Sequence, residues 1–134
     1  MLVKKTHPDA TLPKAATAGS VLDLFSCVDT FILCGTQEAI DTGISMAIPP
    51  GSVGLICDKS SFGLSGIKVM GGVIDSDYRG NILVLLRNHY FKDFKITKGQ
   101  KIANMLILLL GDLSIEEGEL DVTTRTGGFG STGK

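Results

Sequence analysis

Residues 71–80 have the sequence Gly71-Gly72-Val73-Ile74-Asp75-Ser76-Asp77-Tyr78-Arg79-Gly80, in which two glycines and an apolar pair lead into a polar segment. The apolar run 81–86 follows. This pattern predicts a β-hairpin, with strands at residues 72–74 and 81–86 joined by a turn at 75–80. Glycines ahead of a turn also let a partner approach the backbone closely, and a Tyr-Arg pair offers more chemistry than a turn needs. The segment is therefore a hypothesis for a binding site as well as for a turn.

The composition of the 134 residues indicates one folded domain with a real core. Hydrophobic residues make up 43% of the chain, which argues against disorder. The net charge is −1, so no strong field would attract nucleic acid or an acidic membrane, and we expect neither as a partner. The 17 glycines, with few helical patterns around them, favour a turn-rich β protein.

The cysteines and the N-terminus bear on the compartment. Cys27, Cys34 and Cys57 are odd in number and lack CxxC spacing, which indicates reduced, mostly packed thiols and no metal site. The N-terminal residues 1–5 carry two lysines with no apolar segment behind them, unlike a secretory signal. The apolar run 105–110 is too short to span a bilayer. We expect an intracellular protein, cytoplasmic or nuclear.

Strand-like runs recur along the chain with turn signals between them, a spacing that predicts an all-β sandwich or barrel. Besides one short strand within an irregular first segment, the expected strands are 21–26, 30–33, 43–49, 53–57, 67–70, 94–96 and 101–110. Residues 58–63 are expected to form a polar loop or a single helical turn. Residues 102–110 are apolar enough for a helix, but the bracketing Gly99 and Gly111 favour a strand buried on both faces.

The last residues, 123–134, are rich in Gly, Ser and Thr, and we expect a flexible arm after a β domain of residues 1–122. Small residues in succession let backbone N–H groups close around phosphate oxygens. Arg125, Ser131 and Thr132 would add donors to such a nest, and Phe129, alone among glycines, could stack on a flat ring. A plain polar tail is the alternative that composition by itself favours.

Three further segments carry polar chemistry at strand ends. Asp58-Lys59-Ser60-Ser61 offers a cation and two hydroxyls after a strand, which suits phosphate. The segment 98–104 places a turn, Lys101 and the Asn104 amide at the start of a buried strand. Asp23 is a carboxylate within an apolar strand, which is costly unless it is paired or lies at a site.

Taken in order, these segments resemble the motifs of the trimeric dUTP pyrophosphatase (dUTPase) family over nearly the whole chain. Residues 72–80 and 127–133 are close and specific matches, and residues 98–103 are a good one. Residues 59–61 match fairly and residues 22–26 partially.

The resemblance implies a jelly-roll-like all-β fold and a three-fold homotrimer, in which C-terminal arms close over active sites shared between subunits. It implies hydrolysis of dUTP to dUMP and pyrophosphate, with Mg²⁺ on the triphosphate. This activity limits uracil incorporation into DNA and supplies dUMP for dTMP synthesis.

By motif position, the resemblance also implies a role for each site residue. Asp75 would orient and deprotonate the attacking water, and Tyr78 would pack under the deoxyribose and exclude a 2′-hydroxyl. The backbone around Gly71 and Gly72 would bind the uracil edge. The remaining implied residues are the phosphate ligands Lys59, Ser60, Arg125, Ser131 and Thr132, the further substrate-binding residues Ser61, Asn104 and Gly130, the uracil-covering Phe129, and Asp23 near the water shell of the metal.

The chain also departs from the family pattern. Lys59 and Lys101 stand where the family usually has arginine, and Asn104 stands where it has glutamine. Lysine cannot make the bidentate contacts of arginine, so these changes bear on phosphate affinity more than on the reaction. Two alternatives stay open: an interaction protein on the dUTPase fold with little catalysis, and a relative of the dCTP deaminases.

Overall fold

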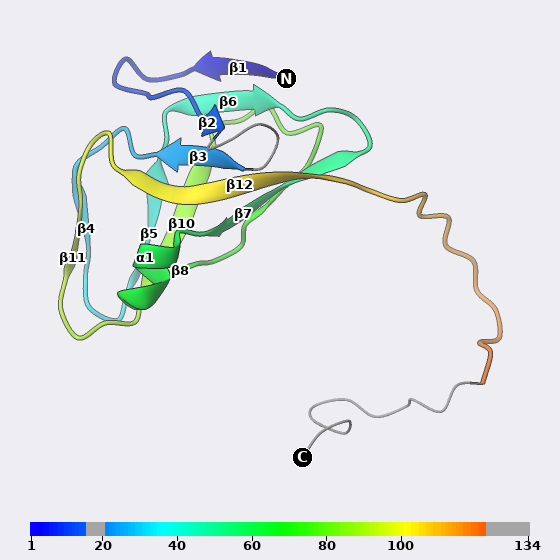
Figure 1. Cartoon of the computed structure of the whole chain (residues 1–134). Coiled ribbons are helices and arrows are strands. Elements are labelled where there is room, and N and C mark those ends of the chain that lie inside the picture. The colour runs from blue at the N-terminus through cyan, green and yellow to red at the C-terminus, as the bar shows by residue number, and fades with distance from the viewer. Residues whose placement is uncertain (16–20, 123–134) are drawn as a thin grey trace.

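The computed structural model describes residues 1–15 and 21–122, which form twelve strands and one short helix (Figure 1). In chain order the elements are β1 (Leu2–Lys5), β2 (Lys14–Ala15), β3 (Leu22–Phe25), β4 (Thr30–Ile32), β5 (Gln37–Asp41), β6 (Ile44–Ala47), β7 (Ser52–Asp58), α1 (Ser60–Leu64), β8 (Ile67–Val69), β9 (Val73–Ile74), β10 (Leu83–Asn88), β11 (Phe94–Ile96) and β12 (Lys101–Leu109). The all-β prediction is therefore confirmed.

The strands pair antiparallel throughout the described residues. The largest sheet has the order β2-β3-β12-β7-β9, and a second has the order β5-β10-β8. The pairs β1-β6 and β11-β4 complete the arrangement. Figure 1 shows β12 crossing the molecule beside β3 and β7, with α1 at the end where β4 and β11 lie.

The core lies between these sheets because alternate residues of each strand face inward. In β10, Val84 and Leu86 are buried while Leu83 is exposed. The apolar side chains with no exposed surface come from several strands that are distant in sequence: Ile32, Ile40, Val84, Ile96, Ile102, Ala103 and Met105. At one end of the core, Phe62 of α1 meets Phe94 of β11 edge to face, with ring centroids 5.0 Å apart.

Most expected elements are confirmed with shifted ends, including the helical turn within 58–63, which is α1. Two strands, β2 and β5, were not expected. The first three residues of β5 are exposed, and Ile40 is its one fully buried side chain, so the sequence Gln37-Glu38-Ala39-Ile40-Asp41 carries no clear apolar alternation. Its place in the sheet comes from pairing with β10.

The predicted hairpin at residues 72–86 is wrong. Strand β9 pairs with β7, with Ile74 opposite Gly54, whereas β10 pairs with β5 and β8. The reason is a close backbone approach at Gly72, where a Cβ would stand 2.5 Å from the carbonyl oxygen of Ile56 in β7. The turn at 75–80 is confirmed, but it connects two different sheets.

The strand at 101–110 is confirmed as β12, but its burial on both faces holds only for the first half. Ile102 and Ala103 are fully buried, whereas Leu109 is 87% exposed. After β12, residues 110–122 run away from the body of the chain, and every one of them is exposed (Figure 1).

Candidate functional site

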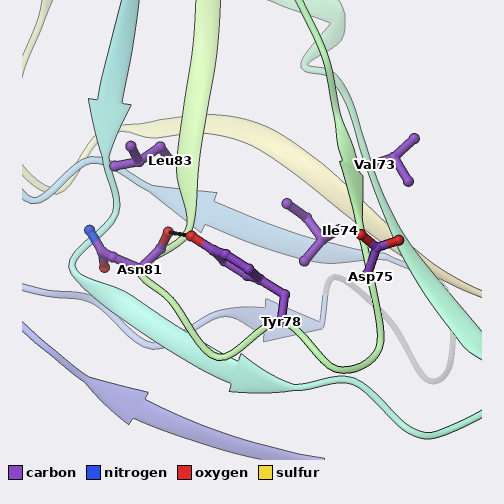
Figure 2. A pocket seen from close by; sticks show the side chains of 6 residues that line it. All are labelled: Val73, Ile74, Asp75, Tyr78, Asn81 and Leu83. Atoms are coloured by element: carbon purple, nitrogen blue, oxygen red, sulfur yellow. Dashed lines mark hydrogen bonds between the residues drawn. The ribbon is translucent and has the colours of Figure 1, made fainter.

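A hollow of about 260 Å³ lies beside the turn that joins β9 to β10. The residues that line it are Val73, Ile74, Asp75, Tyr78, Asn81 and Leu83. In Figure 2 the Tyr78 ring lies between Asn81 and Ile74, and Asp75 follows at the end of β9. The structure thus brings the two predicted site residues of this turn, Asp75 and Tyr78, to one concave surface.

The backbone before the hollow is held rigidly against β7. Gly71 has φ of 59°, in the left-handed region that favours glycine. The Gly72 carbonyl accepts a hydrogen bond of 2.7 Å from the Ile56 N–H. A side chain at Gly72 would separate β9 from β7, because its Cβ would stand 2.5 Å from the Ile56 carbonyl oxygen, whereas a side chain at Gly71 would meet open space and only strain the backbone.

The turn itself is closed by its own polar groups. The Tyr78 N–H donates to the Asp75 carbonyl at 3.2 Å. The Arg79 guanidinium donates to the carbonyls of Ser76 and Tyr78, at 2.7 and 2.9 Å. Arg79 therefore stabilises the turn, whereas Tyr78 lines the hollow.

A second group of predicted residues lies where β3, β12 and β7 run side by side. Asp23 is opposite Asn104 in the strand register, and Asn104 is opposite Cys57. The Lys101 ammonium lies 2.6 Å from Asp23 Oδ1. This contact is an ion pair without the angles of a hydrogen bond, so the buried Oδ1 atom has no hydrogen-bond donor among the described residues.

The Asn104 amide is also only partly satisfied. Its Nδ2 donates a long hydrogen bond of 3.4 Å to the Asp58 carbonyl, and its buried Oδ1 has no donor among the residues that the structure describes. The buried Asn104 Oδ1 is therefore costly unless a ligand or water supplies a donor, whereas Asp23 Oδ1 is compensated by the Lys101 charge.

Lys59, Ser60 and Ser61 lie at the start of α1, next to this second group. The Lys59 ammonium donates to the Lys101 carbonyl at 3.3 Å and lies 4.8 Å from the centroid of the Phe62 ring. The side chains of Ser60 and Ser61 are exposed. One cation and two accessible hydroxyls are thus available to an anion at this edge.

Asp58 fixes the neighbouring loop. Its carboxylate accepts hydrogen bonds from the Lys68 ammonium and from the Val69 N–H, the latter at 2.6 Å. Burial raises the pKa of the Asp58 carboxyl, but these two donors outweigh burial and keep the pKa below its usual value. Asp58 is therefore ionised and committed to holding β8 against the end of β7.

The two groups of site residues occupy opposite ends of β7. Gly54, near its start, pairs with Ile74 next to the hollow, whereas Asp58, at its end, pairs with Ala103. Within one chain, Asp75 and Tyr78 are thus separated from Lys59, Asn104 and Asp23 by the length of a strand. The predicted arm residues Arg125, Phe129, Gly130, Ser131 and Thr132 lie outside the described residues.

Sequence reasoning missed Asn81 as a residue of the hollow and Asp41 as its neighbour. Asn81 follows the quoted motif directly, and its position after Gly80 was the available signal. The sequence gives no such signal for Asp41, because its contact with Asn81 spans 40 residues of sequence.

Asp23 fits a magnesium ion only indirectly. Among the described residues, no three His, Cys, Asp or Glu side chains gather to hold a metal ion. The Asp23 side chain is 17% exposed and already paired with Lys101. The Asp23 carboxylate would still accept a hydrogen bond from a metal-bound water, so the residue fits an ion that is held mainly by other ligands.

Within the part of the chain that the structure describes, α1 is five residues long, and no helix is long and apolar enough to cross a membrane.

The chain is similar in sequence to proteins of one known family. A family model described as dUTPase matches residues 8–133. A deoxyuridine 5′-triphosphate nucleotidohydrolase of Debaryomyces hansenii is 42% identical over 135 residues, covering 94% of this chain and 82% of that protein. One of Hydrogenobaculum sp. is 43% identical over 141 residues, covering 99% of this chain and 97% of that protein.

Solved structures show the same fold. A mutant dUTPase of Staphylococcus bacteriophage 80alpha with dUpNHpp has a TM-score of 0.90 at 22% identity, covering 98% of this chain and 97% of that chain. A mutant dUTPase from phage phi11 of S. aureus, described for the coordination of a structural Mg(II) ion, has a TM-score of 0.83 at 19% identity, covering 89% and 96%. The expected jelly-roll-like fold is thereby confirmed. With nearly its whole length matched by the family model and by relatives above 40% identity, this chain belongs to the dUTPase family.

Proposed function

We propose that this chain hydrolyses dUTP to dUMP and pyrophosphate, and so limits uracil incorporation into DNA while supplying dUMP for dTMP synthesis. The observation that carries the proposal is the shared hollow, in which Asp75 and Tyr78 lie together beside a backbone fixed by Gly72. The family relationship supports the choice of substrate.

Asp75 is the general base of the proposed reaction. It is exposed at the end of β9, so a water molecule can reach its carboxylate. Asp75 orients this water and accepts its proton as the water oxygen bonds to the α-phosphorus. The bond from that phosphorus to the bridging oxygen breaks, and the electron pair leaves with pyrophosphate.

Tyr78 and the glycine backbone select the nucleoside. The Tyr78 ring packs under the deoxyribose, so that a 2′-hydroxyl would clash with it. Backbone groups around Gly71 and Gly72 hydrogen-bond the uracil edge. A cytosine edge would leave such buried groups unpaired, which discriminates strongly between the bases.

The cluster at the ends of β3, β12 and β7 serves the phosphates. Lys59, Ser60 and Ser61 supply a cation and hydroxyl donors, and Arg125, Gly130, Ser131 and Thr132 of the arm supply more. Asn104 donates to phosphate only if its amide turns, because its free end is now an acceptor. Asp23 would accept a hydrogen bond from a water held by Mg²⁺, and the ion would neutralise phosphate charge when it is bound.

A homotrimer would bring these groups together. The hollow and the phosphate cluster lie at opposite ends of β7 within one chain, which supports a site completed by other copies. Residues 110–122 support arm exchange, because apolar side chains such as Leu113 and Ile115 are exposed and are not covered by any of the described residues. Residues 123–134 then close over the nucleotide, with Phe129 on the uracil ring.

An intracellular location, cytoplasmic or nuclear, belongs to the proposal. All three cysteines are free, which suits a reducing compartment.

The testing experiment measures pyrophosphate release from dUTP with Mg²⁺, beside the same assay with dCTP and a mass measurement of the assembly. The expected result is rapid release from dUTP, little from dCTP, and the mass of three chains. No release from dUTP would overturn the enzyme in favour of an interaction protein. Faster turnover of dCTP would point to the deaminase relatives.

A further inference from the structure

Asp41, the last residue of β5, joins segments that are far apart in sequence. Its Oδ1 accepts hydrogen bonds from Asn81 Nδ2 and from the Gly43 N–H, both at 2.6 Å. The N–H of Cys27, which is 1% exposed, donates a hydrogen bond of 2.9 Å to the Asp41 carbonyl, so Asp41 is held through its backbone as well. Burial raises the pKa of the Asp41 carboxyl, but these donors outweigh burial and keep it below its usual value, so the group is a charged acceptor.

The amide of Asn81 is held at both of its ends. Nδ2 donates to Asp41, while Oδ1 accepts a hydrogen bond of 2.8 Å from the Thr6 hydroxyl. An ionised carboxylate can only accept, so the amide cannot turn over without losing the bond to Asp41. Asn81 is thereby fixed between the end of β5 and the segment that follows β1.

The backbone of Asn81 in turn holds Tyr78. The Tyr78 hydroxyl donates to the Asn81 carbonyl at 3.0 Å, as Figure 2 shows. The ring packs so closely on Gly80 that a Cβ there would stand 2.4 Å from the hydroxyl oxygen. Tyr78 and Asn81 line the same hollow, so the place of the ring depends on where Asn81 is held.

We infer that Asp41 is a positioning residue for sugar selection: by anchoring Asn81 it fixes the Tyr78 ring, and so sets the space beside the 2′ carbon of the nucleotide. The inference rests on the proposed hydrolysis of dUTP and on the proposed place of Tyr78 under the sugar. Asp41 is not among the residues that line the hollow, so it acts through Asn81 and not by touching the nucleotide.

A purely structural role would be to cap the corner between β5 and β6 through Gly43. Asp93 offers a matched control for that role. Its Oδ1 accepts a hydrogen bond of 2.8 Å from the Cys34 N–H, and so caps a loop that packs on the β4 and β11 end of the molecule. Removing Asp93 costs a capping hydrogen bond without touching the chain of contacts through Asn81.

The test compares kcat/KM for dUTP and for UTP in the parent, Asp41→Ala, Asp41→Asn and Asp93→Ala, each as the full chain in its native assembly. A misplacement of about 1 Å can cost up to about a hundredfold, so Asp41→Ala is expected to lower the preference for dUTP by about tenfold to a hundredfold. Asp41→Asn keeps an acceptor oxygen and should retain most of the preference. Asp93→Ala should keep the preference of the parent, whatever its stability.

A second measurement follows the ring directly. The sequence contains two tyrosines, so a Tyr90→Phe background leaves Tyr78 as the single tyrosine for ring-carbon NMR. Asp41→Ala should shift these signals, and Asp93→Ala should not. If Asp41→Ala does not fold, Thr6→Val serves in its place, because it removes the other anchor of Asn81 at an exposed residue.

The outcomes separate the two claims. A parent that leaves dUTP intact overturns the proposed function and this inference with it. A parent that hydrolyses dUTP, beside anchor variants with unchanged sugar preference and unchanged Tyr78 signals, overturns the role of Asp41 alone.

Discussion

Gly72 and Ile56 approach each other backbone to backbone: their hydrogen bond is 2.7 Å long, and a Cβ on residue 72 would stand 2.5 Å from the Ile56 carbonyl oxygen. The contact fixes β9 on β7 and places Asp75 beside the hollow. The atom that a Cβ on residue 72 would meet first belongs to the backbone of β7, so no flexible side chain can move aside to make room.

Gly72→Ala should therefore destabilise the fold and reduce dUTP turnover together. Forcing a methyl group into a packed region costs about 1–3 kcal/mol, and here it also pushes Asp75 out of place. Thermal unfolding and a pyrophosphate assay measure the two effects. Gly63→Ala is the matched control, since a Cβ there meets nothing within 4 Å, and it should leave both quantities near the parent values.

Asp75→Asn should abolish most turnover while the protein stays folded. An amide cannot accept the proton of the attacking water, and the loss of a general base costs about 10²–10⁴ in rate. Asp77→Asn provides the control, because Asp77 lies in the same turn but not among the residues of the hollow. Comparable rates in the two variants would contradict the assignment of the base.

The ion pair of Lys101 with Asp23 should contribute more to stability than the exposed ion pair of Lys98 with Asp9. Lys101→Met leaves a buried carboxylate oxygen unpaired, and we expect a loss of about 1–3 kcal/mol after allowance for partial exposure. The double variant with Asp23→Asn should recover part of that loss. The pair of Lys98 with Asp9, at 49% and 46% exposure, should contribute less than the pair of Lys101 with Asp23, because solvent screens it. Urea unfolding of a double-mutant cycle for each pair gives the comparison.

Because of Asp58, the free energy of unfolding should decrease at acidic pH. Its pKa in the folded chain lies below the unfolded value of about 3.9, so its contribution is complete above that value and is lost as the pH falls through the folded pKa. Asp58→Asn should thus be less stable than the parent near neutral pH, with the difference shrinking in acid. Unfolding curves recorded from about pH 6 down to about pH 2 would show this, and a difference that stays constant over that range would contradict it.

The three thiols should react in the order of their exposure. Cys34 is exposed, Cys57 is half-buried and Cys27 is buried. Burial and then the nearby Asp41 carboxylate raise the pKa of the Cys27 thiol, which lowers its thiolate fraction further. Mass spectrometry after treatment of the native protein with a thiol reagent should find Cys34 labelled first and Cys27 last. Early labelling of Cys27 would show that the core opens more readily than its packing indicates.

The sequence was informative where a strand carries its own apolar pattern. Strands such as β7 and β12 were predicted because Val53–Cys57 and residues 101–110 are apolar between glycines or prolines. Strand β5 was missed because a polar segment acquires its place only by pairing with β10. Local pattern carries no information about such a partner.

The site residues, too, were predictable where they belong to one local motif and were missed where they depend on contacts between distant segments. Asp75 and Tyr78 were predictable because they belong to one continuous motif beside glycines. The pairing of β9 with β7 was not, since alternation along a strand does not say which neighbour it will choose. Asp41 lies 40 residues from Asn81, and only the folded chain brings the carboxylate and the amide together.

Because β9 and β10 belong to separate sheets, the segment from Asp75 to Gly80 spans the gap between two layers of the protein. Sliding of one layer over the other would change the distance between Asp75, the proposed general base, and Tyr78, the proposed floor of the sugar site. Substitutions deep in the interior, such as at Ile56 or Val84, would then alter catalysis without touching the substrate, and a search for more active variants would do well to include them.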